Sequence, residues 1–446
     1  MTSGDTMAAV ATAGGTGAVA LIRLSGPEAA EIVARACDCR ADWTDRRAVL
    51  RTVRDEGGAV IDQVLVTLFF APRSYTGDTV AEIATHGGRL VTRKVLARLL
   101  ECGARSAKPG EFTERAFLNG KLDLTQAEAV MDLISAQSDL ALRAAHEQLE
   151  GRIGEKTEKL RQELIDTVAN LEAWIDFPEE DIDPETGEAL RRRISAVRAE
   201  MGSLLSTADQ GRILREGLRT VICGRPNAGK SSLMNQLLGS ERAIVSGTEG
   251  TTRDTIEEML VIAGVPLRMV DTAGLREAGD EIEEEGIRRT IKEAERADLL
   301  IVVVDATLPA AGAMPARLPE VARRIVVQNK CDLGEHPDWA AMDGVRVSCL
   351  DGSGLEELRG KIRDLADLGE ADWGEHSVAI NARHRDRLMR ADEALQRADA
   401  SLAANAEPEI TALDLREAMD YLGEIAGRID TEEILGSIFS RFCIGK

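Results

Sequence analysis

Residues 224–231, G-R-P-N-A-G-K-S, fit the pattern G-x-x-x-x-G-K-[ST], which is typical of loops that hold phosphate groups. The apolar run 221–223 before this loop predicts a buried strand, and the helical spacing of apolar residues over 231–238 predicts a helix after it. In that setting glycines let backbone N–H groups face a phosphate, and the start of the helix adds a favourable field. Lys230 is then expected to reach the β- and γ-phosphates, and Ser231 to hold Mg²⁺. A chance match is the alternative, which the strand–loop–helix context disfavours.

A second motif, N-K-C-D at residues 329–332, also follows an apolar run. A carboxylate at Asp332 can accept hydrogen bonds from N1–H and the 2-amino group of guanine. Adenine offers neither donor there, and such a mismatch is worth roughly 10⁴ or more in sites built this way. Ser348, followed by Cys349 and Leu350, would place backbone amides near guanine O6. Alone, N-K-x-D is equally well explained as a solvated loop, but the order of the motifs favours GTP over ATP.

The residues around the γ-phosphate are expected in two further segments. Asp271 of D-T-A-G supports Mg²⁺, often through water, and the Gly274 N–H can sense the γ-phosphate. Thr252, in the G-T-T-R-D segment, is a candidate hydroxyl ligand of Mg²⁺. The next position after D-T-A-G, where many GTPases carry a water-orienting glutamine, holds Leu275, so another group must orient the water.

Acidic residues downstream of Leu275 are candidates for orienting the attacking water, although most of them also suit the solvated start of a helix. They are Glu277, Asp280, Glu281, Glu283, Glu284 and Glu285. Residue type alone does not choose among them. The charge that an arginine finger supplies in other GTPases is also unassigned, and a monovalent cation bound by the amide oxygen of Asn227 is a physical substitute.

The composition limits the class of protein. A chain of 446 residues should hold two or three domains. Its net charge of −22 argues against an intrinsic grip on nucleic acid or on an anionic membrane, so either role would need a local basic patch or a basic partner. Seven scattered cysteines fit neither a zinc site nor a disulfide framework and favour a reducing cytoplasm.

The first part of the chain has mixed α/β character. Strands are expected at 18–24, 48–53 and 64–70, and helices at 27–36 and 89–100. The polar segments 72–78 and 108–115 suit binding loops, with solvated connections as the alternative.

The region from residue 125 to 207 is expected to be helical. Thr125 and Glu128 match a capping box, and one long helix is predicted by the apolar spacing of Leu149, Ile153, Leu160, Leu164, Val168 and Leu171. The acidic, proline-flanked segment 177–184 predicts a loop, with metal binding as the lesser alternative. Another helix is expected over 187–207.

The nucleotide-binding region, about 218–367, alternates strands and helices. Its expected strands are 218–223, 257–262, 267–271, 299–305, 324–328 and 345–348. This order predicts a doubly wound sheet. Helices predicted at 384–403, 412–421 and 431–439 would rejoin the first helical block, making the nucleotide-binding domain an insertion. The expected domains are 1–121, 122–215, 216–371 and 372–446.

Together with L-N-G-K-L-D-L at 118–124 and F-C-I-G-K at 442–446, these motifs resemble the MnmE (TrmE) family of tRNA modification GTPases over the whole chain. The phosphate-loop motif is generic, whereas G-T-T-R-D, D-T-A-G-L-R-E and the terminal C-[IL]-G-K are together specific. The resemblance implies an α/β domain for dimerisation and tetrahydrofolate binding, a helical domain, and an inserted Ras-like G domain. Tyr75 stands where a phenylalanine is common.

The resemblance also implies a function. The family works in the cytoplasm with MnmG, a partner that carries FAD and uses NADH, in a heterotetramer built on a homodimer. The pair adds an aminomethyl or carboxymethylaminomethyl group to C5 of the wobble uridine of certain tRNAs. The one-carbon unit comes from 5,10-methylenetetrahydrofolate, for which 5-formyltetrahydrofolate is an analogue. The G domains meet when GTP and K⁺ bind, and the tRNA is expected to be gripped mainly by the partner.

Site residues follow from the same resemblance. The GTP-binding residues are Asn227, Ala228, Gly229, Lys230, Ser231, Ser232, Ser246, Gly247, Thr248, Glu249, Gly250, Thr251, Thr252, Asp271, Thr272, Ala273, Gly274, Asn329, Lys330, Asp332 and Ser348. Ser231 and Thr252 would hold Mg²⁺; Asn227, Ser246, Thr248 and Thr251 would hold K⁺. Glu283 falls at the position of the family's catalytic glutamate.

The implied folate ligands are Arg23, Glu82, Lys121 and the terminal Lys446. Without the resemblance, each of these four would be read as a surface salt-bridge residue. Cys443 matches a cysteine that matters for modification and lies near the folate site in the family. The alternative for Cys443 is a small residue packed near a terminus.

Two other classes of function compete. A ribosome-assembly GTPase would share the phosphate site but should carry a basic RNA-binding domain, whereas this chain is acidic. A dynamin-like membrane GTPase would use the long helices as a stalk, but the sequence shows no basic or apolar membrane-binding segment.

Overall fold

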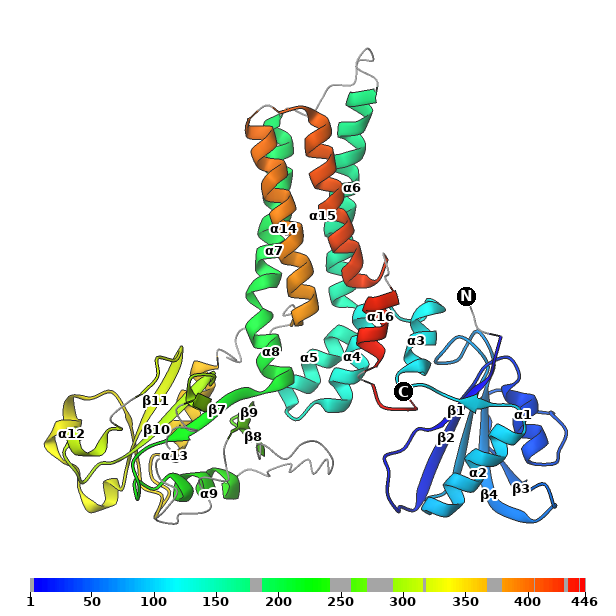
Figure 1. Ribbon diagram of the computed structural model, residues 1–446, viewed down its shortest axis with the longest axis horizontal. Coiled ribbons are helices and arrows are strands. Elements are labelled where there is room, and N and C mark those ends of the chain that lie inside the picture. Colours follow the sequence, from blue (N-terminus) through cyan, green and yellow to red (C-terminus); the bar gives the residue numbers. More distant parts are fainter. Residues whose placement is uncertain are drawn as a thin grey trace. The chain divides into compact units, whose positions relative to one another are not determined.

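The computed structural model describes residues 4–176, 187–240, 258–270, 292–315, 318–366, 379–404, 406–428, 432–440 and 442–445 (Figure 1). The chain divides into two compact units. The first unit comprises Met1–Met131, Leu149–Gly187 and Ala394–Lys446, and the second comprises Asp132–Gln148 and Glu188–Glu393. No helix among the described residues is long and apolar enough to cross a membrane.

The first unit contains a mixed sheet in the strand order β3-β4-β5-β2-β1-β6. Its strands are β1 (Met7–Val10), β2 (Val19–Ser25), β3 (Val49–Arg54), β4 (Val60–Phe69), β5 (Val80–His86) and β6 (Arg105–Ser106). Alternate side chains of β4, such as Val64 and Val66, are buried in one core with Ile32 of α1 and with Val95 and Leu99 of α2. Because buried side chains alternate along the strand, α1 and α2 pack against one face of this sheet.

The helices of the described residues are α1 (Ala29–Ala36), α2 (Arg89–Glu101), α3 (Glu111–Leu118), α4 (Leu124–Ser135), α5 (Asp139–Leu149), α6 (Arg152–Asp176), α7 (Gly187–Ser206), α8 (Ala208–Glu216), α9 (Lys230–Ser240), α12 (Ala310–Ala313), α13 (Leu355–Leu365), α14 (Ala382–Ala403), α15 (Pro408–Ala426) and α16 (Glu432–Phe439). Short 3₁₀ turns occupy Cys331–Leu333 and Pro337–Ala341. The helices expected at 27–36, 89–100, 384–403 and 431–439 are confirmed with shifts of one or two residues at their ends. The helix expected at 412–421 is longer than predicted and spans Pro408–Ala426.

Two local predictions for the helical region are wrong. The capping box lies two residues earlier than expected, because Asp123 Oδ1 accepts the Gln126 N–H at 2.8 Å while Gln126 Oε1 accepts the Asp123 N–H at 2.9 Å. The predicted long helix does not start at Leu149, which ends α5. Gly151, with φ of 88°, separates α5 from α6, because such a backbone angle cannot continue a right-handed helix.

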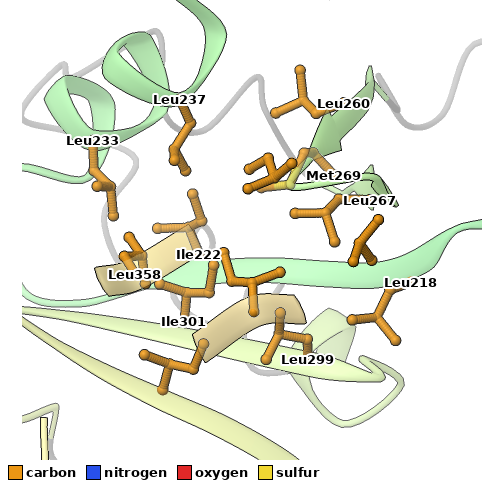
Figure 2. Packing of buried hydrophobic residues seen from close by; sticks show 14 of the residues in the cluster. Leu218, Ile222, Leu233, Leu237, Leu260, Leu267, Met269, Leu299, Ile301 and Leu358 are labelled. Atoms are coloured by element: carbon orange, nitrogen blue, oxygen red, sulfur yellow. The ribbon is translucent and has the colours of Figure 1, made fainter. Parts of the chain in front are cut away.

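The second unit contains the doubly wound sheet that was predicted, and its strands lie in the order β12-β11-β10-β7-β9-β8. Its strands are β7 (Leu218–Cys223), β8 (Glu258–Ile262), β9 (Val265–Met269), β10 (Leu299–Asp305), β11 (Arg323–Asn329) and β12 (Val345–Val347). Only β8 pairs antiparallel among these described strands. Figure 2 shows Ile222 and Ile301 of the sheet packed with Leu233 and Leu237 of α9 and Leu358 of α13. The core of this sheet is therefore aliphatic, in keeping with a chain of which only 3% of residues are aromatic.

Helices α5 and α8 extend the core of this sheet. Ala141, Ile213 and Leu214 are buried in the same cluster as the strand residues. Arg212 of α8 forms two hydrogen bonds of 3.0 Å with the carboxylate of Asp298, just before β10. The sequence predicted one helix over 187–207 and did not predict α8 as a separate helix.

Candidate functional site

The phosphate loop joins β7 to α9, and its shape depends on two glycines. A Cβ at Gly224 would lie 2.2 Å from the carbonyl oxygen of Val303, and one at Gly229 would lie 2.0 Å from Asn329 Nδ2. Both residues also have positive φ, at 151° and 100°. The loop therefore lies so close to β10 and β11 that no side chain fits at these positions. Asn227 adopts φ of 61° between them.

Asn329 connects the three motifs that the sequence predicted to meet. Its Nδ2 donates to the Ala228 carbonyl at 2.8 Å, and its Oδ1 accepts the Cys349 N–H at 3.3 Å. The residue is 2% exposed. One buried amide thus braces the phosphate loop against both guanine-recognition loops, which places predicted phosphate and base ligands beside each other.

Lys230 begins α9 and lies against the phosphate loop. Its Nζ donates to the carbonyl oxygens of Gly224 and Arg225, both at 3.0 Å. The ammonium is therefore held at the loop, where the motif requires it to meet the β- and γ-phosphates. Ser231 and Ser232 follow in the first turn of α9.

The base side of the site is formed by the turns after β11 and β12. Asp332 is exposed in the Cys331–Leu333 turn, so its carboxylate is accessible to a ligand. Ser348 is fully buried, and its Oγ accepts the Leu350 N–H at 3.2 Å. Burial and the nearby charge of Asp332 raise the pKa of Cys349 to about 11, so this thiol stays protonated at neutral pH.

Lys330 is positioned by Asp305, a residue that the sequence analysis did not single out. The Lys330 Nζ lies 2.6 Å from Asp305 Oδ2, and Thr307 donates to Asp305 Oδ1 at 2.7 Å. Burial alone would raise the pKa of Asp305, but the bonds from Lys330 and Thr307 outweigh it and lower that pKa. The only sequence signal was an acidic residue at the end of the apolar strand β10.

Several predicted ligands lie outside the described residues. They are Ser246, Gly247, Thr248, Glu249, Gly250, Thr251, Thr252, Asp271, Thr272, Ala273, Gly274, Glu283 and Lys446. The acidic alternatives to Glu283 and the segment 177–184 lie outside them as well.

A second candidate site lies in the first unit, where Arg23 of β2 stands opposite Glu82 of β5. Arg23 Nη2 and Nε lie 2.7 and 3.1 Å from Glu82 Oε1. The guanidinium carbon is 5.6 Å from the Tyr75 ring centre and 5.9 Å from that of Phe112. Arg23 is thus held by a carboxylate and two aromatic rings, of which only the carboxylate was predicted as part of the site.

The two polar segments predicted as binding loops meet near this pair, but the prediction of a loop over all of 108–115 is wrong, because Glu111–Leu118 form helix α3. Tyr75 Oη and Thr113 Oγ1 are 2.9 Å apart, and Lys121 Nζ donates to the Pro72 carbonyl at 3.2 Å. Lys121 therefore contacts the 72–78 loop.

The C-terminal segment is tied to the N-terminal domain. Ile444 pairs with Pro109, and the Gly110 N–H donates to the Cys443 carbonyl at 3.4 Å. A Cβ at Gly445 would lie 2.4 Å from the Val10 carbonyl oxygen, and its φ is 98°. The segment thus passes the start of α3, the helix that also carries Phe112, and leaves Cys443 exposed.

The doubly wound sheet, its glycine phosphate loop and the adjacent N-K-C-D turn define a P-loop GTP-binding protein. The family model described as MnmE helical domain matches residues 124–443, and the model described as GTP-binding protein TrmE N-terminus matches residues 6–121. The chain belongs to the MnmE (TrmE) family of tRNA modification GTPases, and it is a GTP hydrolase that acts in tRNA modification.

Relatives match over almost the full length. A tRNA modification GTPase MnmE from Akkermansia muciniphila is 52% identical over 99% of both chains. The protein of the same name from Geobacter sulfurreducens is 44% identical, again over 99% of both. Among solved structures, the G domain of the T. maritima FeoB iron transporter is 24% identical and covers 33% of this chain and 98% of its own, with a TM-score of 0.23. That score is too low to bear on the fold.

Proposed function

We propose that this GTPase is activated by K⁺ and, with an FAD-carrying partner of the MnmG type, adds an aminomethyl or carboxymethylaminomethyl group to C5 of the wobble uridine of certain tRNAs. A tetrahydrofolate bound by the N-terminal domain supplies the one-carbon unit. The observation that carries the proposal is the Arg23–Glu82 pair in the domain that also receives the Cys443 segment. The reaction takes place in the cytoplasm.

The Arg23–Glu82 pair suits a folate. A pterin presents an amide-like edge that a carboxylate such as Glu82 can accept from, and the glutamate tail of the ligand needs cations. Arg23 and Lys121 are the cations of this set among the described residues. The side chains of Arg23 and Glu82 are 18% and 28% exposed, so they are shielded from water without being sealed off from a ligand.

A homodimer is supported by an apolar row on the sheet face that carries this pair. The row consists of Leu50, Leu65, Ala84 and Leu21, which stand opposite one another in β3, β4, β5 and β2. Leu50 and Leu65 are 59% and 50% exposed. Arg23 and Glu82 lie two residues along their strands from this row and therefore share its face. A second copy of the domain would cover the exposed leucines and complete the surroundings of the folate site.

The GTPase chemistry is assigned to residues on the phosphate loop and on the switch segments. Ser231 and Thr252 hold Mg²⁺, and Glu283 orients the attacking water, a task that Leu275 cannot perform. Asn227 is exposed on the phosphate loop, and its side chain makes no hydrogen bond within the described part of the chain. Its amide oxygen is therefore available to K⁺, with Ser246, Thr248 and Thr251 as further ligands. K⁺ bound there would supply positive charge beside the phosphates as the G domains of a dimer meet.

Calorimetry with 5-formyltetrahydrofolate tests the folate site in the full chain. Arg23→Ala should weaken folate binding roughly tenfold or more through the loss of a charge-assisted contact, while GTP binding stays unchanged. Arg47→Ala is the matched control, because it removes an exposed arginine of the same domain. Equal folate affinity of the Arg23 variant and the wild type would exclude Arg23 as a residue of the folate-binding site. Mass spectrometry of wobble nucleosides from cells lacking the gene then tests the reaction itself.

A further inference from the structure

Helix α2 has an apolar face and a basic face. Thr92, Val95 and Leu99 are buried against the sheet. Arg89, Arg93 and Lys94 are exposed on the first two turns. We call these three residues the α2 basic face.

The cations of this face are unneutralised. Within the described residues, none of the three side chains has an ion pair or a hydrogen bond. Arg98, the fourth cation of α2, differs: its Nη1 lies 3.2 Å from Glu101 and 3.9 Å from Glu56. Glu101 is the only acidic residue of the helix, and none occupies its first turn. These three cations therefore form a local positive charge in a chain whose net charge is −22.

The surroundings of the helix start carry little negative charge. The segment 12–18, T-A-G-G-T-G-A, is exposed and uncharged, and its Gly17 N–H donates to the Gly87 carbonyl at 3.0 Å. Asp62, the carboxylate that the structure places next to this turn, is 8% exposed and accepts from the His86 N–H at 2.9 Å. His86 Nδ1 lies 2.6 Å from the other oxygen of the same carboxylate. This charge is directed at His86 and leaves the α2 basic face open.

We propose that the α2 basic face binds the phosphate backbone of tRNA. Phosphate contacts need only accessible cations and fix how a nucleic acid lies on a protein without reading its sequence. Because the rest of this chain is strongly acidic, a polyanion is repelled elsewhere and directed to this face. The contribution adds to the grip of the MnmG-type partner. An anionic membrane is the less favoured occupant, because stable lipid recognition uses about 4–8 clustered cations.

The test uses the full chain without its partner and bulk tRNA as the probe. Binding is measured by fluorescence anisotropy at several potassium chloride concentrations. The variant Arg89→Gln, Arg93→Gln, Lys94→Gln should bind roughly tenfold more weakly, and its salt slope should fall by up to about 3. The control variant Arg143→Gln, Lys292→Gln, Arg363→Gln removes three exposed cations from the second unit, with the same change in net charge. It should bind tRNA like the wild type.

Three outcomes would overturn the proposal: wild-type chain that does not bind tRNA, equal weakening by both variants, or an unchanged salt slope in the α2 variant. A loss of binding to phosphatidylglycerol vesicles with tRNA binding intact would assign the face to a membrane instead. GTP hydrolysis and 5-formyltetrahydrofolate binding should be normal in the α2 variant. Those two measurements separate failure of this proposal from failure of the proposed function.

Discussion

Different chemical groups form the two sites, which are the guanine-nucleotide site of the second unit and the Arg23–Glu82 site of the first unit. The nucleotide site is largely backbone: glycine turns, helix and strand ends, and one buried amide, Asn329, that spans two loops. The other site is made of side chains from two strands, the 72–78 loop and helix α3, and the C-terminal segment passes the start of that helix. The glycine positions of the nucleotide site leave no room for a side chain, whereas the Arg23–Glu82 site consists of side-chain contacts that can be removed one at a time. Perturbing each should therefore leave the other unaffected.

The largest expected effect is at guanine recognition. Asp332→Asn should lower GTP affinity by roughly 10⁴, because the carboxylate that accepts from two guanine donors is lost. Xanthosine triphosphate, whose base has a carbonyl in place of the amino group, should become the better ligand. Competition calorimetry with both nucleotides measures the change. If the variant still prefers GTP, then Asp332 does not read the base.

Removal of the water-orienting group comes next. Glu283→Ala should retain GTP binding but reduce single-turnover hydrolysis by roughly 10³, the scale of a lost general base or water-positioning residue. Glu285→Ala, two residues away in the same acidic run, should hydrolyse GTP normally. Near-normal turnover of the Glu283 variant would return the role to the neighbouring acids.

The cation prediction has an intermediate effect. Hydrolysis should be faster in KCl than in NaCl by roughly 10², since K⁺ would stabilise charge that develops on the phosphates. Asn227→Ala should abolish most of this difference while GTP affinity changes little. Equal wild-type rates in the two salts would contradict the assignment of a K⁺ ligand.

The smallest expected effect concerns the terminal segment. Gly445→Ala should raise amide hydrogen exchange at Gly110, whose N–H donates to the Cys443 carbonyl, by roughly tenfold, because a Cβ cannot fit beside the Val10 carbonyl and the strained segment detaches. Gly436→Ala, which meets nothing within 4 Å, is the control. GTP hydrolysis should be unchanged in both variants. A change in hydrolysis would show that the two sites are coupled.

Most of the nucleotide site could be predicted from the sequence, because its residues lie in short motifs of consecutive residues. Strands β7 and β10 lie at their predicted limits, and the phosphate loop and N-K-C-D follow such strands directly. The role of Asp305 was not predicted, because it depends on the alignment of two parallel strands that pair Asp305 with Asn329. Nothing in the local pattern of a strand end specifies which neighbour it will meet.

Less of the first unit could be predicted from the sequence. Strand β1 is a short alanine-rich segment and β5 mixes apolar and polar residues, so neither had a strong strand signal. The capping box was assigned to Thr125 because that residue type suits a cap, whereas Asp123 and Gln126 form the reciprocal pair. The pairing of Ile444 with Pro109 joins residues far apart in sequence, and no periodicity predicts it.

The two hydrogen bonds of the Asn329 side chain make the nucleotide site sensitive to a chemical change of this amide. Exchange of its amide nitrogen for oxygen, as in Asn329→Asp or in spontaneous deamidation, would direct a carboxylate at the Ala228 carbonyl and turn attraction into repulsion. The base-reading turn and the phosphate cradle would separate together. An ageing preparation would therefore lose nucleotide affinity through one altered atom of a residue that joins two loops.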